Sequence, residues 1–420
     1  VAKLITDGEK KIVVLSAMSG TTNTLVEISD YLYKKNPEGA NEIINKLETK
    51  YKQHIDELFA TPEYKQKGLE IIKSHFDYIR SYTKDLFTLF EEKVVLAQGE
   101  LISTAMVNFY LQECGVKSVL LPALEFMRTD KNAEPDPIYI KEKLLAQLEL
   151  YPDADIYITQ GFICRNAYGE IDNLQRGGSD YTASLIGAAI NASEIQIWTD
   201  IDGMHNNDPR IVDKTAPVRQ LHFEEAAELA YFGAKILHPT CIQPAKYANI
   251  PVRLLNTMDP EAPGTLISND TEKGKIKAVA AKDNITAIKI KSSRMLLAHG
   301  FLRKVFEIFE SYQTSIDMIC TSEVGVSVTV DNTKHLNEIL DDLKKYGTVT
   351  VDKEMCIICV VGDLEWENVG FEAKALDAMR DIPVRMISFG GSNYNISFLI
   401  RECDKKVALQ SLSDMLFNGK

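Results

Sequence analysis

The sequence has 420 residues, of which 45% are hydrophobic and 25% charged, as in ordinary globular proteins. Because single hydrophobic cores stop growing near about 250 to 300 residues, we expect two or three domains. The net charge of −13 argues against a nucleic-acid partner, which requires clustered Lys and Arg. We expect a cytoplasmic protein with no membrane partner, because no apolar run approaches the roughly 18 residues that span a bilayer and the first residues do not resemble a signal peptide.

The cysteines predict reduced thiols rather than a disulfide framework, because there are seven of them, an odd number, scattered along the chain. Cys356 and Cys359 form the one close pair, in the run MCIICVVG. In a strand, residues three apart face opposite sides, so the sequence predicts neither a metal site nor a redox pair there.

Short apolar runs rich in β-branched residues alternate with segments of helical periodicity through the first two-thirds of the chain. The strand candidates are residues 11–17, 117–122, 155–162, 195–200 and 250–256. Helical spacing is seen in Ile43, Ile44, Leu47 and Tyr51, and again in Leu69, Ile72, Phe76, Ile79, Leu86 and Phe90. This alternation predicts an α/β fold with a mostly parallel sheet flanked by helices. Ligands of such sheets bind beyond the carboxyl ends of the strands, where residues 16–23, 160–162 and 199–210 carry polar side chains.

The segment NLQRGGSDYTASLIGAAI, residues 173–190, predicts a helix start. Paired glycines allow unusual backbone conformations, and Ser or Asp before an apolar run is typical of an N-cap. The free N–H groups of such a start favour an anion. A tight turn with a cap explains the segment equally well when it is taken alone.

The chain changes character after residues 259–275, DPEAPGTLISNDTEKGK, which we interpret as a linker. From about residue 285 it predicts strand, helix, strand, strand, helix, strand, and then repeats this order with an offset of about 70 residues. Residues 315–343 and 383–412 show the repeat most clearly. The repeat predicts two ferredoxin-like units. Their function is either regulation or structural dimerisation.

Several familiar motifs are missing from the sequence. It contains no GxxxxGK[ST] loop, no GxGxxG, no HExxH and no HRD kinase signature. DIDGMHNND, residues 200–208, does not fit a calcium loop, because its glycine comes too early and no Glu closes it.

Taken together, the polar segments resemble the aspartate kinases of the amino-acid kinase superfamily. The matching segments, in chain order, are VVLSAMSGTTNTL, QGE with Ser103 beyond, GFI, RGGSDYTAS, WTDIDGM with DPR, ELAYFGAKILHP, and IPVRLLNT with PGT. The final repeat resembles the tandem ACT modules of that family. The resemblance implies an amino-acid kinase fold over residues 1–274, followed by βαββαβ ACT modules at 275–350 and 351–420 whose strands can interleave.

The implied reaction moves the γ-phosphoryl group of ATP to the side-chain carboxylate of L-aspartate and gives 4-phospho-L-aspartate, the first step toward lysine, threonine and methionine. The acceptor carboxylate has a pKa of about 4 and is already ionised, so no general base is required. Positioning and charge neutralisation remain as the work of the protein. We expect Mg²⁺ to enter with ATP, bound through phosphate oxygens and water, with no metal ligands supplied by a protein cage and no prosthetic group.

The resemblance assigns the aspartate site residue by residue. Arg176 would clamp the α-carboxylate, Gly177 and Gly178 would allow close approach, and Ser179 would add a hydrogen bond. Asp180 would orient the substrate amino group, Arg176 or a catalytic lysine; as an alternative, it is simply an N-cap. The remaining substrate contacts would be Glu100, which accepts the ammonium group, Thr22 and Phe162. Without the resemblance these three are a helix-start acid, a turn residue and a core aromatic.

On the nucleotide side the resemblance implies an adenosine-contacting pair and two cations. The implied ATP-binding residues are Thr199, Asp200, His205, Arg210, Lys235 and Ile236. His205 stands where family members often have Tyr. Lys235 and Arg210 would neutralise phosphate charge, and Lys235 joins Arg176 and Asp180 as a catalytic residue; either cation could otherwise be a surface side chain.

The first ACT module resembles a lysine-sensing pattern. The matching positions are Met295, Phe301, Leu302, Asp317, Thr321 and Ser322. Gly300 would start a helix that takes the effector carboxylate, and Asp317 would take its ammonium group. Ala298 replaces the Ser of lysine-inhibited relatives, which leaves lysine and threonine open as effectors. Phe301 and Leu302 could equally be core residues. We expect a homodimer or a larger assembly through the ACT modules.

Family members begin with a strand and a phosphate-binding loop reading like KFGGTSV, and the quoted residues start inside the helix that follows it. Since every later motif is intact, we expect that segment upstream of Val1 rather than a protein that lacks it. Two other functions stay open: a different amino-acid kinase, and a non-catalytic chain that senses an amino acid.

Overall fold

A computed structural model describes residues 2–84, 86–174, 177–233, 237–292 and 299–418. The chain divides into two compact units. The first contains Val1–Ile197 and Thr240–Val252, and the second contains Trp198–Pro239 and Arg253–Lys420.

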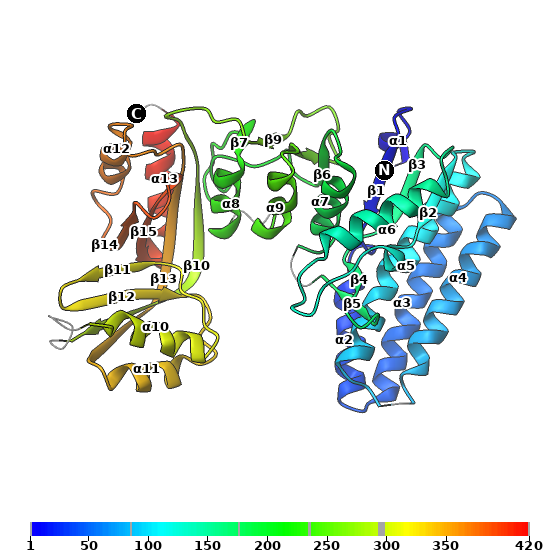
Figure 1. The fold of residues 1–420 in the computed structure, drawn as a ribbon, viewed down its shortest axis with the longest axis horizontal. Coiled ribbons are helices and arrows are strands. Elements are labelled where there is room, and N and C mark those ends of the chain that lie inside the picture. The colour runs from blue at the N-terminus through cyan, green and yellow to red at the C-terminus, as the bar shows by residue number, and fades with distance from the viewer. Residues whose placement is uncertain (1, 85, 175–176, 234–236, 293–298, 419–420) are drawn as a thin grey trace. The chain divides into compact units, whose positions relative to one another are not determined.

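The first unit contains a parallel sheet in the order β1–β3–β2 (Figure 1). Its strands are β1 (Lys11–Leu15), β3 (Ile156–Gln160) and β2 (Ser118–Leu121), as the sequence predicts. The other elements around it are α1 (Ala2–Ile5), η1 (Ala123–Glu125), α6 (Pro137–Glu149), the hairpin of β4 (Ile163–Arg165) and β5 (Ile171–Asn173), and α7 (Gly178–Ile190). Every residue of β3 is buried, because this central strand is covered on both faces.

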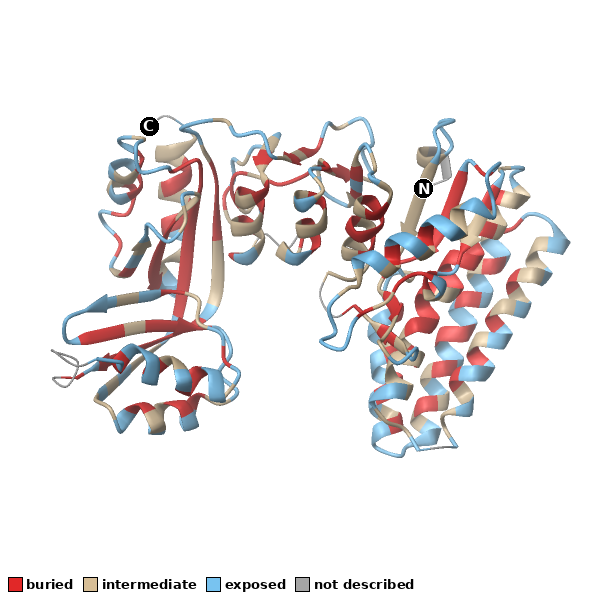
Figure 2. Cartoon of the chain, viewed as in Figure 1, coloured by how far each residue is buried: buried red, intermediate tan, exposed pale blue. Residues whose placement is uncertain are grey.

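A layer of long helices accompanies this sheet. It consists of α2 (Thr21–Tyr33), α3 (Pro37–Leu58), α4 (Pro62–Ser81) and α5 (Leu89–Glu113). Their apolar stripes meet in one core with Ile44, Tyr51, Ile72, Phe76 and Ile102. Figure 2 shows buried residues, in red, along these helices. The predicted continuation of the α4 pattern to Leu86 and Phe90 is wrong: α4 ends at Ser81, and these side chains are 75% and 55% exposed.

Helix α5 qualifies for a membrane span by length and composition, which the sequence analysis did not anticipate. The helix packs against α2, α4, β2 and β3, and 67% of its most apolar window is buried inside the fold. Core helices of folded domains have this same composition, so the finding is weak evidence for a membrane segment.

A second sheet runs in the order β6–β8–β9–β7. Its strands are β6 (Ile195–Thr199), β8 (Val252–Asn256), β9 (Thr265–Ser268) and β7 (Gln220–His222), and β7 pairs in parallel with β9. Helices α8 (Phe223–Tyr231) and α9 (Pro239–Tyr247) come between these strands in the chain. The predicted linker at 259–275 is therefore wrong in part, because β9 lies inside it.

The C-terminal repeats share one antiparallel sheet in the order β11–β12–β10–β13–β15–β14. Its strands are β10 (Ile276–Lys291), β11 (Ile319–Ser322), β12 (Gly325–Val330), β13 (Thr348–Gly362), β14 (Val384–Phe389) and β15 (Asn395–Arg401). Its helices are α10 (Phe301–Ser311), α11 (Leu336–Lys344), α12 (Phe371–Ala378) and α13 (Lys405–Leu416), with η2 (Glu402–Asp404) before the last.

The two long strands of this sheet belong to both repeats. The first half of β10 pairs with the second half of β13, and the register shifts between Lys282 and Ile285 before the pairing continues in the other halves. The ferredoxin-like repeats and their interleaved strands are thus present. The borders at residues 274 and 350 stay predictions.

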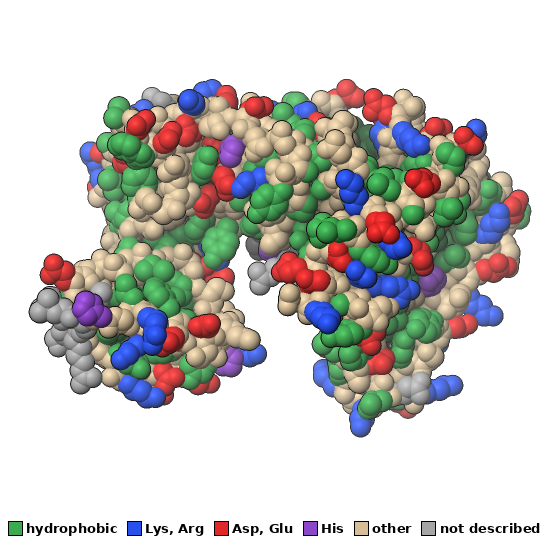
Figure 3. Space-filling view, viewed as in Figure 1, with side chains coloured by type: hydrophobic (Ala, Val, Ile, Leu, Met, Phe, Trp, Pro, Cys, Tyr) green, Lys and Arg blue, Asp and Glu red, His purple; other side chains and the backbone are tan. Residues whose placement is uncertain are grey.

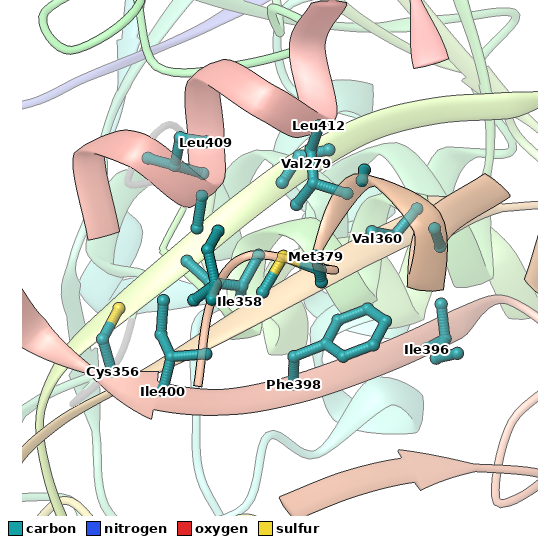
Figure 4. Close-up of a cluster of buried hydrophobic side chains, with 14 of the residues drawn as sticks. Val279, Cys356, Ile358, Val360, Met379, Ile396, Phe398, Ile400, Leu409 and Leu412 are labelled. Carbon is teal, nitrogen blue, oxygen red and sulfur yellow. The ribbon is translucent and has the colours of Figure 1, made fainter. Parts of the chain in front are cut away.

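The second repeat has its own core, drawn in Figure 4, where Phe398, Ile358 and Leu409 meet between the sheet and α13. Cys356 belongs to this core and Cys359 does not, so the two thiols face opposite sides of β13 as predicted. Burial raises the pKa of both thiols. In Figure 3 acidic and basic side chains are interspersed over the face in view.

Candidate active site

Glu100 is a buried carboxylate near the carboxyl end of β1. It lies on α5, is 3% exposed, and its Oε1 accepts the Ala17 backbone N–H at 3.3 Å. Its Oε2 is buried without a hydrogen-bond partner among the described residues. Burial raises the pKa of Glu100 to about 7, and the backbone N–H groups of Ala17 and of Glu100 itself only partly oppose this. A buried acceptor of this kind is suited to a cationic ligand.

Residues from β1, α5, β3 and α7 meet beside this carboxylate. Ser16 Oγ donates to Ser179 Oγ at 2.6 Å, and Ser103 Oγ donates to the Ser16 carbonyl at 2.8 Å. Gly161, just after β3, lies so close to α7 that an added Cβ would come within 2.7 Å of the Ser179 Cα. Only glycine fits at this crossing, because the clash involves backbone.

Phe162 has a strained backbone. Its φ is 66°, in the left-handed region that bulky residues rarely adopt. The conformation is held by its N–H, which donates to the buried Thr182 Oγ1 at 3.0 Å, and its side chain lies over Gly178. Strain of this kind clusters at ligand sites, which agrees with the predicted role of Phe162 without testing it.

The start of α7 differs from a simple capped turn. Gly177 is the N-cap with φ 74°, Gly178 follows with φ 42°, and among the described residues no side chain caps the helix. The alternative that Asp180 is the N-cap is therefore wrong, since Asp180 lies three residues after Gly177 and donates its own N–H to the Gly177 carbonyl at 3.0 Å. Burial raises the pKa of Asp180 to about 6. Arg176, the predicted carboxylate clamp, lies outside the described residues.

The two threonines after Gly20 have different environments. Thr21 is buried and its Oγ1 lies 2.9 Å from the Tyr51 hydroxyl, whereas Thr22, the predicted substrate contact, is exposed in the first turn of α2. Thr22 is therefore accessible to a ligand from the turn that also supplies Ala17.

The predicted nucleotide residues belong to the second unit. Thr199 ends β6 and its Oγ1 accepts the Ile201 N–H at 3.2 Å, and Asp200 beside it is exposed. His205 Nδ1 lies 2.9 Å from Thr215 Oγ1, and burial lowers the pKa of this imidazole. Lys235 and Ile236 lie outside the described residues.

Arg210 is already paired within its own motif. Its guanidinium binds both carboxylate oxygens of Asp208, at 2.9 and 2.7 Å, while the side chain remains 77% exposed. This pairing holds the pKa of Asp208 below its usual range. A phosphate would have to share Arg210 with Asp208 or displace it.

The predicted effector residues have mixed environments. Gly300 caps α10 with φ 81°, Phe301 is buried, Leu302 is 37% exposed, and Thr321 and Ser322 are exposed on β11. The alternative of a core residue thus fits Phe301 better than Leu302. Met295 lies outside the described residues.

Asp317 has partners that the sequence did not reveal. Its Oδ1 accepts from the Tyr231 hydroxyl at 2.7 Å and from Lys282 Nζ at 2.7 Å, and Lys282 also binds Asp331 at 2.9 Å. Its Oδ2 is buried with no partner in the described part of the chain. An arriving ammonium group would therefore meet one free carboxylate oxygen.

Sequence reasoning missed Ser16, Gly161, Tyr231 and Lys282 as parts of these sites. Ser16 lies in VVLSAMSGTTNTL, Gly161 in GFI and Tyr231 in ELAYFGAKILHP, so the matched segments were an available signal for three of the four. Among the residues that the structure describes, no group of three or more His, Cys, Asp or Glu side chains could hold a metal ion.

Comparison with known proteins defines the class. A family model described as "Amino acid kinase family" matches residues 1–256, and an ACT domain model matches residues 358–416. The chain belongs to the amino acid kinase family, and within it to the aspartokinases, as the following relatives show.

Aspartokinase 1, chloroplastic, of Arabidopsis thaliana is 35% identical over 433 residues, which cover 98% of this chain and 75% of that protein. Lysine-sensitive aspartokinase 3 of Escherichia coli is 32% identical over 428 residues, covering 99% and 94%. The E. coli aspartokinase III structure in complex with aspartate and ADP (R-state) matches with a TM-score of 0.85 and 31% identity, over 99% of this chain and 95% of that one. Its complex with lysine and aspartate (T-state) matches with a TM-score of 0.81 and 32% identity over the same shares. The predicted family and fold are confirmed.

Proposed function

We propose that this protein transfers the γ-phosphoryl group of ATP to the side-chain carboxylate of L-aspartate and is inhibited by an amino acid bound at its ACT modules. The observation that carries the proposal is Glu100, a buried carboxylate with one free oxygen, joined through Ser16 and Ala17 to the start of α7. A carboxylate beside helix N–H groups suits a zwitterion, with ammonium on Glu100 and α-carboxylate at the helix start.

The residues divide the work between binding and charge neutralisation. Glu100 would bind the substrate ammonium, Arg176 and Ser179 the α-carboxylate, and Thr22 and Phe162 would complete the pocket. Asp180 would orient the amino group or a cation, and it requires such a partner because burial disfavours its ionised form. No side chain needs to remove a proton, since the acceptor is already an anion.

For the second substrate, the aspartokinase III complex with ADP supports ATP as phosphoryl donor. We assign Thr199, Asp200 and His205 to adenosine, and Arg210, Lys235 and Ile236 to the phosphates and their surroundings. Mg²⁺ would reach the site on the phosphates, and the proposal includes no metal ligands from the chain.

We assign lysine, rather than threonine, as effector, because the relatives include a lysine-sensitive enzyme and a lysine-bound structure. Asp317 Oδ2 would accept one ammonium group of lysine, and the N–H groups at the start of α10 would bind its carboxylate. Phe301, Leu302, Thr321, Ser322 and Met295 would line the site. A dimer through the ACT modules belongs to the proposal, and the cytoplasmic location stays a prediction, since several relatives are named as chloroplastic.

The test is an ATP-consumption assay of the full-length protein against aspartate, glutamate, N-acetylglutamate and a nucleoside monophosphate. Hydroxylamine traps acyl phosphates as hydroxamates. With MgATP present, we expect a hydroxamate to form with aspartate and with none of the other acceptors. Millimolar lysine should suppress it and threonine should not. Equal activity with another acceptor, or no acyl phosphate, would overturn the proposed reaction; inhibition by threonine alone would overturn only the effector.

A further inference from the structure

The turn between β1 and α2 is held from two sides, and one of them is the helix that carries Glu100. A Cβ added at Gly99 would lie 2.8 Å from the Ala17 Cβ and 3.2 Å from the Thr21 Cγ2. Helix α5 can therefore approach the turn this closely only because residue 99 is glycine. The neighbouring Glu100 accepts the N–H of Ala17, so the position of the turn decides where the carboxylate finds its donor.

On the other side the turn is held by Tyr51, in the middle of α3. Thr21 and Tyr51 are 1% and 0% exposed, and their hydroxyl oxygens lie 2.9 Å apart. Among the described residues, each of these hydroxyls has the other as its hydrogen-bond partner. The Tyr51 ring also packs edge-on against Phe76 of α4, with centroids 5.8 Å apart, so the hydroxyl cannot move without the helix layer.

We propose that Tyr51 is a positioning residue of the aspartate site: its hydroxyl fixes Thr21, and through Thr21 the turn that presents Ala17 to Glu100 and Thr22 to the substrate. Tyr51 is fully buried, and the proposal gives it no contact with a ligand. The inference rests on the proposed function, since it names a residue that acts on the same aspartate site through Thr21 and not by contact with the substrate.

The Tyr51 hydroxyl stays protonated throughout the working pH range, and either hydroxyl of the pair can be the donor. Burial is the main cause that raises the pKa of Tyr51 to about 12, and the Glu100 carboxylate adds to it. Packing alone would require only a ring at this position, whereas the hydroxyl needs a partner in the core. Phe would fill the space equally well, so the effect of the hydroxyl can be separated from that of the ring.

The experiment measures KM for aspartate, KM for ATP, kcat and melting temperature of the full-length protein with Tyr51→Phe. A net hydrogen bond of ordinary strength predicts a rise of about three- to tenfold in KM for aspartate. We expect KM for ATP to stay unchanged and kcat to change less than about twofold. Tyr157→Phe is the matched control, because it removes another buried hydroxyl of the same unit, whose partner is the Tyr151 carbonyl at 2.7 Å.

A double-mutant cycle tests the route through Thr21. Thr21→Val keeps the shape of the side chain and removes its hydroxyl, so it should raise KM for aspartate as Tyr51→Phe does. The double variant should be no worse than the poorer single one, because the two changes delete one interaction.

Each outcome decides. An unchanged KM for aspartate in Tyr51→Phe, additive effects in the cycle, or an equal effect from Tyr157→Phe would show that Tyr51 is only a core residue. Wild-type protein without aspartate-dependent turnover would instead refute the proposed function.

Discussion

Aspartate should bind more weakly as the pH falls from 8 to 6, because a proton competes with the substrate ammonium for Glu100. With a pKa of about 7, the carboxylate is about nine-tenths ionised at pH 8 and about one-tenth ionised at pH 6. If only the ionised form binds, KM for aspartate rises about tenfold over this range. The measurement is KM for aspartate at saturating MgATP in steps of half a pH unit.

Glu100→Gln supplies the decisive comparison. The amide cannot ionise, so KM for aspartate should be high at every pH and nearly independent of pH between 6 and 8. Glu27→Gln is the control, because Glu27 is an exposed carboxylate on α2 of the same unit. A wild-type KM that stays flat, or a Glu100→Gln profile that keeps the wild-type slope, would refute the assignment of the ammonium to Glu100.

Glu100→Gln should make the folded protein more stable at pH 8, although it weakens aspartate binding. Glu100 has its folded-state pKa raised from 4.5 to about 7, so the folded state holds the proton more tightly than the unfolded state. Its contribution to the free energy of unfolding is then most favourable below pH 4.5 and is lost as the pH rises through 7. At pH 8 the ionised carboxylate costs about 3.5 kcal/mol, from a shift of roughly 2.5 pH units at about 1.4 kcal/mol each.

At pH 8 the free energy of unfolding of Glu100→Gln should therefore exceed that of the wild type by up to this amount, so the variant unfolds at a higher denaturant concentration. The difference in free energy should vanish near pH 4. Denaturant titrations at the two pH values measure it. A variant that is less stable than the wild type at pH 8 would show that the carboxylate is satisfied in the empty site, contrary to the free Oε2.

Three further results are expected. Gly161→Ala should lose most activity and several degrees of melting temperature, because its Cβ would strike the Ser179 backbone, whereas Gly391→Ala, which faces open space, should change neither measurement. Arg210→Gln should raise KM for ATP about tenfold and leave KM for aspartate unchanged in steady-state assays, and the reverse pattern would contradict its assignment to phosphate. Asp317→Asn should raise the lysine concentration for half-inhibition at least about tenfold with kcat preserved; unchanged inhibition would place the effector elsewhere.

The sequence predicts the fold well where burial alone decides it. The strand candidates at 11–17 and 155–162 are confirmed as β1 and β3. In β3 every residue is buried, and β-branched runs that are covered on both faces have few alternatives, whereas the residues of β1 are only partly buried. The pattern fails at Leu86, because helical spacing continues by chance past the end of α4 at Ser81. It also misses β9, whose four residues lie among Pro, Gly and charged residues that favour a loop.

The site is predictable at the level of residue types, and less so at the level of contacts. Resemblance selects Glu100, and the sequence alone could not reveal that one of its oxygens is buried without a partner. Thr21 and Thr22 have identical side chains. Only the face of α2 on which each one lies decides that Thr21 is buried and Thr22 is exposed. The sequence predicts that Asp317 binds the ammonium group of an effector, yet Lys282 from β10 already binds it. The two residues are 35 positions apart, so the sequence alone could not reveal this contact.

The two proposed ammonium sites both rely on a buried carboxylate oxygen without a partner, but they differ in the groups that already contact the carboxylate. Glu100 and Asp317 each keep one buried oxygen without a partner, and an unpartnered buried acceptor favours the arrival of a donor. At Glu100 no described cation precedes the substrate, so binding supplies the first positive charge and relieves the desolvation of the carboxylate. At Asp317 the Lys282 ammonium and the Tyr231 hydroxyl already occupy the other oxygen, so an effector adds a second cation to an existing network.

That network reaches from the ACT sheet into α8, because Tyr231 is the last residue of that helix, four positions before Lys235. Lysine bound at Asp317 Oδ2 would therefore add a positive charge to a carboxylate whose other oxygen also holds the end of α8. Tyr231→Phe separates the two roles: it leaves Lys282 on Asp317 and over the ring at position 231, and it removes the hydrogen bond between α8 and Asp317. If this contact carries inhibition, the variant should bind lysine in a calorimetric titration while losing at least half of its maximal inhibition. Full inhibition in Tyr231→Phe would show that coupling takes another route.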